Sequence, residues 1–140
     1  TYGNIMGRQA YTLSVPSEDY VRQADYFGMA TGRKVNKFEK TGLTPVKSEL
    51  VDAPYVGEFP MVLECKVIHH HEIGLHTQFV GEICDVKIDD NMLNDDGDPE
   101  MEKIRPFVYS PEFRRYHGVG EFIGKAFDIG KDPDPSYRKT

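Results

Sequence analysis

The sequence has few cysteines, no long apolar run and no excess of basic residues. Its two cysteines, Cys65 and Cys84, neither form a CxxC pair nor complete a zinc motif. No apolar run approaches the roughly 18 residues that a membrane-spanning helix needs. The formal net charge of −6 disfavours non-specific binding to nucleic acid or to an anionic membrane, because both require a basic face. We therefore expect no nucleic acid, no membrane partner, and a reducing, cytoplasmic compartment.

The chain has the size of one domain. At 140 residues it can bury roughly two-thirds of its unfolded surface, so it needs no disulfide to fold. Thr1–Arg8 is expected to be the end of a helix. Ala10–Pro16 alternates apolar and polar residues, as a half-buried strand does. Ser17 is a suitable N-cap, and the apolar spacing over Glu18–Met29 predicts an amphipathic helix.

The clearest hairpin lies in the middle of the sequence. Thr41–Pro60 is rich in proline, which favours edge strands and loops. Val62–His69 and Thr77–Asp89 then read as two strands around a glycine turn. In the second strand the apolar alternation changes face, which predicts a β-bulge at Gly81 or at the Cys84–Asp85 step.

The last third is predicted with weaker patterns. Asp89–Glu102 reads as an acidic loop, Ile104–Tyr109 as a short strand, and Gly118–Phe127 as the last strand. Asp128–Thr140 is charged and contains two prolines, so we expect a loose tail. Spaced strands with turn signals favour a mostly β barrel or sandwich.

One basic segment stands out in this acidic chain. Tyr26–Phe38 holds no acidic residue and places Arg33, Lys34 and Lys37 directly after Gly32. Backbone N–H groups near a glycine, together with cations, can form a pocket for a phosphate. The alternative is a solvated basic loop after a helix.

The histidines allow a metal site or a purely structural role. Within the run His69–His71, only His69 and His71 can share a face of a strand, and Glu72 or a distant residue would have to complete a metal site. His76 begins a strand after a glycine turn. No nucleophile elbow, P-loop or recognisable carboxylate pair is present. Any chemistry would therefore belong to a bound cofactor.

Four ordered segments carry a family resemblance. They are DYFGMATGRKVNKFEKTGLTPV at Asp25–Val46, VDAPYVGEFPMVLECKV at Val51–Val67, GLHTQFVGEICDV at Gly74–Val86 and YHGVGEFIGKAFDIGK at Tyr116–Lys131. From Thr1 to about Lys131 the sequence resembles the FMN-binding split-barrel flavin reductase family. The resemblance implies a mostly β fold with short helices, a split β-barrel, that homodimerises and holds one FMN per subunit.

The resemblance also implies site residues. Thr1 and Lys37 correspond to the residues that hold the FMN phosphate, and Gly32 and Arg33 belong to the same loop. His76 resembles a histidine near the flavin or the nicotinamide, which makes it the candidate catalytic residue. No metal is implied.

Family members usually carry further strands before the position of Thr1. We therefore expect this chain to lack the N-terminal strands of the barrel, with residues 1–131 as the FMN-binding domain and 132–140 as a flexible tail. Asn36 stands where the family usually has aspartate.

The resemblance implies an FMN-dependent oxidoreductase that passes electrons through bound FMN to a redox partner protein. One alternative is an NAD(P)H:flavin oxidoreductase that supplies reduced flavin to a partner. Another is a non-catalytic barrel that has lost FMN.

Overall fold

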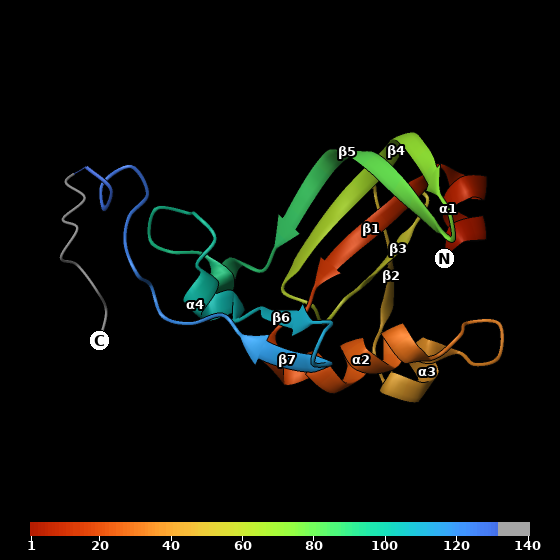
Figure 1. Cartoon of the computed structure of the whole chain (residues 1–140), viewed down its shortest axis with the longest axis horizontal. Helices are drawn as coiled ribbons and strands as arrows, with labels where there is room; N and C mark the ends of the chain where they lie inside the picture. The colour runs from red at the N-terminus through yellow and green to blue at the C-terminus, as the bar shows by residue number, and fades with distance from the viewer. Residues whose placement is uncertain (132–140) are drawn as a thin grey trace.

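A three-stranded antiparallel sheet organises the chain. The structure is a computed structural model that describes residues 1–131. In the sheet, β4 (Met61–Ile73) lies between β1 (Ala10–Val15) and β5 (His76–Ile88). Figure 1 shows this sheet arching above two short helices, α2 and α3. The mostly β class with short helices is confirmed, and within the described residues the sheets do not close into a complete barrel.

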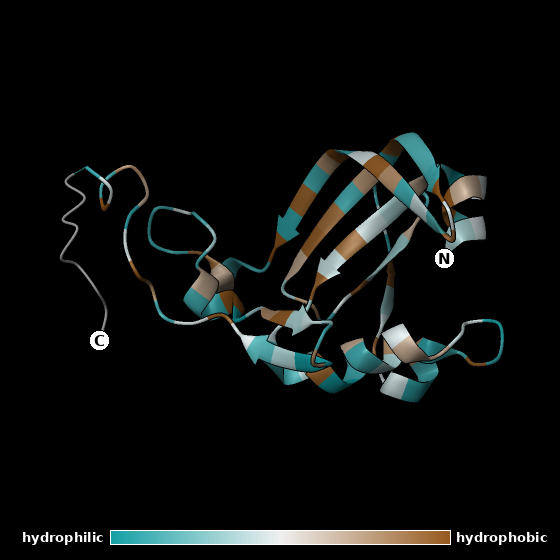
Figure 2. Cartoon of the chain, viewed as in Figure 1, coloured by the Kyte–Doolittle hydropathy of each residue, from teal (hydrophilic) through white to brown (hydrophobic). Residues whose placement is uncertain are grey.

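The predicted hairpin is formed by β4 and β5. β4 is longer than the sequence indicated, and β5 has the predicted length but begins and ends one residue earlier. Apolar and polar residues alternate along them, as the brown and teal bands in Figure 2 show. The ladder shifts register twice. In β5, Cys84 has no partner, although Ile83 and Asp85 on either side of it are paired. In β4, Ile68 has no partner, although Val67 beside it pairs with Gly81. The irregularity at Cys84 lies in the second strand, at one of the two positions where the sequence predicts a bulge. The other unpaired residue, Ile68, belongs to β4 and was not predicted.

The first helices follow the prediction with one difference. α1 spans Tyr2–Arg8 and ends at Gln9 in the left-handed conformation. The helix expected over Glu18–Met29 begins as a 3-10 turn, η1 (Glu18–Tyr20), and continues as α2 (Val21–Met29). Ser17 occupies the N-cap position of η1, but its side chain makes no capping hydrogen bond.

The proline-rich region forms a small edge sheet and supplies the core. β2 (Pro45–Lys47) pairs with β3 (Pro54–Val56), as expected for edge strands. α3 (Lys37–Thr41) precedes them. The core cluster consists of Leu43, Val56 and Phe59, with Tyr20, Phe27 and Phe38 packed against it. The aromatic residues of α2 and α3 are thus anchored to the edge sheet.

The prediction for the last third is partly wrong. The region after β5 contains η2 (Asp90–Met92) and α4 (Met101–Ile104), so the expected loop holds two short helical turns. Ile104 is buried at the end of α4, and the strand begins only at β6 (Phe107–Ser110).

The last strand is β7 (Arg115–Gly118), not Gly118–Phe127. The β6–β7 ladder ends where Phe107 meets Gly118, and residues 119–131 pair with no strand in the part of the chain that the structure describes. The trace of residues 119–131 runs away from the sheet (Figure 1). The expected tail over 132–140 lies outside the described residues. No helix within residues 1–131 is long and apolar enough to cross a membrane.

Candidate functional site

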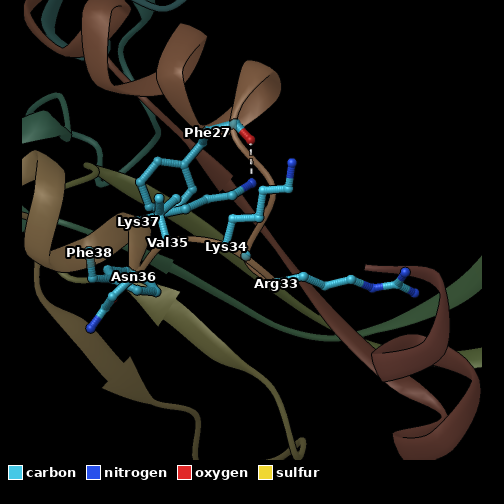
Figure 3. Close-up of a pocket in the computed structure, with 8 residues that line it drawn as sticks. Phe27, Arg33, Lys34, Val35, Asn36, Lys37 and Phe38 are labelled. Atoms are coloured by element: carbon cyan, nitrogen blue, oxygen red, sulfur yellow. Dashed lines mark hydrogen bonds between the residues drawn. The ribbon is translucent and has the colours of Figure 1, made fainter.

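A basic cavity of about 580 Å³ lies between the end of α2 and the start of α3. Eight residues line it: Phe27, Gly32, Arg33, Lys34, Val35, Asn36, Lys37 and Phe38. Three of these residues are cations and none is acidic. Figure 3 shows them around the turn that joins the two helices. This composition suits an anion.

Local hydrogen bonds shape the turn between the helices. The backbone N–H of Lys34 donates to the carbonyl oxygen of Thr31 at 3.0 Å. The Asn36 side chain accepts a hydrogen bond from the backbone N–H of Glu39 at 3.4 Å, and so caps α3. The cations are therefore carried by a short turn with defined ends.

Two aromatic rings form one wall of the cavity. Phe27 of α2 and Phe38 of α3 meet edge to face, with ring centroids 5.3 Å apart and an interplanar angle of 83°. Both pack against the core cluster. Because aromatic pairs favour this geometry, the wall also holds the two helices together.

Lys37 is tied to this wall. Its Nζ donates a hydrogen bond of 2.6 Å to the carbonyl oxygen of Phe27 and lies 5.6 Å from the centroid of the Phe27 ring. An ammonium group has three donors, so this bond leaves two for a ligand. Arg33 extends away from the Lys37–Phe27 pair, as Figure 3 shows. The three cations therefore do not all converge on one point.

A second cavity, of about 460 Å³, adjoins the first. It includes Thr1, Thr12, Ser14 and Tyr55, and shares Phe27 and Phe38 with the basic cavity. The structure thus brings Gly32, Arg33 and Lys37 into one cavity and places Thr1 in its neighbour. That these four residues hold one phosphate stays a prediction.

His76 lies apart from both cavities. It is the first residue of β5, exposed at the end of the hairpin, and pairs with Ile73. No group of three or more His, Cys, Asp or Glu side chains within residues 1–131 is arranged to hold a metal ion. A catalytic role for His76 stays a prediction.

Lys34 also lines the cavity, although the family resemblance does not single it out. The sequence signal for Lys34 as a lining residue was its position beside Arg33 in the basic segment, because residues of one short turn necessarily lie close together.

Comparison with known proteins shows which family this chain is part of. The pattern that defines the flavin reductase like domain matches residues 1–120. The chain belongs to the flavin reductase-like family. This confirms the resemblance drawn from the four sequence segments.

Solved structures extend the comparison. Flavoredoxin of Desulfovibrio vulgaris (Miyazaki F) is 54% identical with a TM-score of 0.88, over 93% of this chain and 69% of that one. A Shewanella frigidimarina protein described as a putative flavin reductase with a split barrel domain is 28% identical with a TM-score of 0.76, over 90% of this chain and 64% of that one. The fold is thus that of the split-barrel flavin reductase-like proteins. Among these proteins, the segments TYGNIM and APYVGEFP most resemble flavoredoxin.

Among curated sequences, a protein of Archaeoglobus fulgidus is 37% identical over 91 residues, which is 65% of this chain and 50% of that protein. The chain spans about half the length of the curated relatives that it matches.

Proposed function

We propose that the chain binds FMN and passes electrons through it, as part of a homodimer. The observation that carries this proposal is the basic cavity: three cations and no acid, in a chain of net charge −6 that belongs to the flavin reductase-like family. Flavoredoxin, which the chain resembles at 54% identity, supports the redox assignment.

The residues present fit the phosphate end of FMN. A phosphate monoester carries close to two negative charges at neutral pH and accepts several hydrogen bonds. Lys37 and Arg33 supply charge and donors. The backbone at Gly32 leaves room for close approach, because no atom beyond its chain neighbours lies within 4 Å of the position of an added Cβ. Thr1 would contribute its hydroxyl from the adjoining cavity.

When bound, FMN would supply the redox chemistry, since its ring accepts and gives up electrons. The residues of the chain would bind and orient it. Lys37, fixed by Phe27, would hold the phosphate at a defined place, and the Phe27–Phe38 wall would exclude water from one side. His76 would act near the ring or the nicotinamide of an electron donor.

The absorbance spectrum of the purified protein tests flavin binding. We expect a yellow protein that releases FMN on denaturation, or one that binds added FMN with quenching of flavin fluorescence. A colourless protein that does not bind added FMN would refute the proposal and favour a non-catalytic barrel.

Anaerobic mixing with NADH or NADPH then separates two redox roles. Bleaching of the flavin absorbance by either nucleotide would indicate an NAD(P)H:flavin oxidoreductase. Absence of bleaching with both would indicate an electron carrier that is reduced by a protein partner. Light scattering coupled to size-exclusion chromatography tests the homodimer.

A further inference from the structure

Both cysteines of the chain lie in the β4–β5 hairpin, where its ladder is irregular. Cys65 of β4 pairs with Ile83 of β5. The next pair along the ladder joins Glu64 to Asp85, so Cys84 is an extra residue in β5. At a β-bulge, two residues of one strand oppose one residue of the other. Ile83 and Cys84 therefore both lie opposite Cys65.

The two cysteines also lie on the same face of the sheet. Residues two positions apart in a strand share a face, so Cys65 shares a face with Leu63. Leu63 pairs with Val86, and Cys84 comes two residues before Val86. Neighbouring strands lie about 4.8 Å apart, and a disulfide joins Cα atoms that are about 4.4–6.8 Å apart. The position of Cys84 is therefore within reach of a disulfide to Cys65.

The two thiols differ in their access to solvent. Cys65 is only 1% exposed, whereas Cys84 is partly exposed. Tyr11, the partner of Cys65 in β1, reaches across β4, since an added Cβ at Gly81 in β5 would collide with its hydroxyl. Burial raises the pKa of the Cys65 thiol, and the nearby charge of Cys84 raises it further. Because the thiolate is the nucleophile, a reagent from solvent should react first with Cys84.

We propose that Cys65 and Cys84 form a dithiol site that a low-molecular-weight disulfide, such as oxidised glutathione, converts to an intrachain disulfide. The Cys84 thiolate attacks one sulfur of the reagent, the reagent's S–S bond breaks, and one thiolate leaves. Cys65 then attacks the Cys84 sulfur of the mixed disulfide, and the second thiolate leaves with the Cys65 proton. The two cysteines are oxidised and the reagent is reduced to two thiols. No flavin takes part, so this inference is independent of the proposed function.

Peptide mapping of the whole chain tests the site. The chain is incubated with excess oxidised glutathione, its remaining thiols are blocked with N-ethylmaleimide, and it is digested with trypsin. Cleavage after Lys47, Lys66 and Lys87 places the two cysteines in separate peptides, 48–66 and 67–87. We expect these peptides to be joined in a chain that stays monomeric on a non-reducing denaturing gel. Reduction with dithiothreitol should separate them.

Two variants test the order of the steps. Cys65→Ala lacks the second nucleophile, so glutathione should accumulate on Cys84. Cys84→Ser keeps only the buried thiol, which we expect to react at least about 100-fold more slowly, because a buried group reacts only when the structure opens locally. Equal melting temperatures of Cys84→Ser and the unchanged chain would show that the fold is kept. The unchanged chain and Cys84→Ser suffice for the test if Cys65→Ala does not fold.

Three results would overturn the inference. The first is the absence of joined peptides in the unchanged chain under excess oxidised glutathione. The second is a disulfide that joins two chains in place of the two strands of one hairpin. The third is a thiol in folded Cys84→Ser that reacts as fast as Cys84 does in the unchanged chain.

Discussion

Lys37 joins the end of one helix to the start of the next through its hydrogen bond to the Phe27 carbonyl oxygen, 2.6 Å from Nζ. Phe27 lies in the last turn of α2, and the last intrahelical bond of that helix goes to Tyr26. The Phe27 carbonyl would thus lack a backbone partner, as carbonyl groups at helix ends do. A cation at the C-terminal end of a helix also interacts favourably with the helix dipole. One side chain therefore both orders the cavity and presents charge to it.

Replacing Lys37 with alanine is expected to lower FMN affinity by about 1.5–3 kcal/mol, the size of a lost charge-assisted hydrogen bond. Fluorescence titration measures this loss. Lys40→Ala is the matched control, because Lys40 belongs to the same helix but does not line the cavity. An FMN affinity equal to that of the unchanged chain would contradict the assignment of Lys37 to the phosphate.

The carboxylate of Glu64 is expected to stabilise the fold at a place remote from the basic cavity. Its side chain is fully buried, and it accepts hydrogen bonds from the backbone N–H groups of Leu50, at 2.9 Å, and Glu49, at 3.4 Å. Lys87 Nζ lies 3.7 Å away. Glu64→Ala would leave two backbone donors without their partner, and we expect a loss of about 2–4 kcal/mol in the free energy of unfolding.

Urea denaturation measures this loss, and Glu49→Ala is the control. Glu49 lies at the same 3.7 Å from Lys87, but its side chain is 79% exposed. Its removal should change the stability by less than about 0.5 kcal/mol. Equal effects of the two substitutions would show that the ion pair with Lys87, and not the backbone hydrogen bonds, is what Glu64 contributes.

The sequence predicts a strand best where the strand with which it pairs lies close to it along the chain. The β4–β5 hairpin has both its strands and its turn in one stretch, and the change of face in the apolar pattern of the second strand located the irregularity at Cys84. The weak alternation over Gly118–Phe127 had no such partner. Pairing depends on the bounds of the partner strand, and Phe107, the first residue of β6, pairs with Gly118. No local pattern contains that information.

The same contrast applies to the site. Gly32 and Arg33 lie in the turn before α3 and Lys37 begins that helix, so a common cavity follows from their spacing. The contact between Lys37 and the Phe27 carbonyl depends on how two helices pack, which the sequence does not state. The positions of Thr1 and His76 relative to this cavity depend on the whole fold. For those two residues the family resemblance, and not the spacing, supplied the prediction.

His76→Ala should separate electron transfer from flavin binding. Because His76 lines neither cavity, we expect its removal to leave FMN affinity unchanged. If His76 acts near the nicotinamide, the rate of flavin reduction by NADH or NADPH should fall. Stopped-flow bleaching measures that rate, with His71→Ala as the control, since His71 is an exposed histidine on the same hairpin. Equal rates for both variants would exclude a specific role for His76.

The Glu58 carboxylate is expected to stabilise the edge sheet at neutral pH and to lose this effect in acid. Both of its carboxylate oxygens accept a hydrogen bond from the backbone N–H of Thr44, each at 2.9 Å. Burial opposes the charged form, but these hydrogen bonds outweigh it, so the pKa of Glu58 is lowered. A carboxyl group with a lowered pKa in the folded state stabilises the protein above its unfolded pKa of about 4.3, and this stabilisation is lost as the pH falls through the folded pKa.

Glu58→Gln removes this contribution. We expect the variant to be less stable than the unchanged chain at pH 7, with a difference that shrinks as the pH falls below about 4, because the native carboxylate becomes protonated there. Urea midpoints measured from pH 7 to pH 3 follow the difference. Glu112→Gln is the control, since Glu112 is exposed and makes no side-chain hydrogen bond or ion pair within the part of the chain that the structure describes. A difference between Glu58→Gln and the unchanged chain that does not vary with pH would show that the Thr44 contact stabilises the fold by geometry alone.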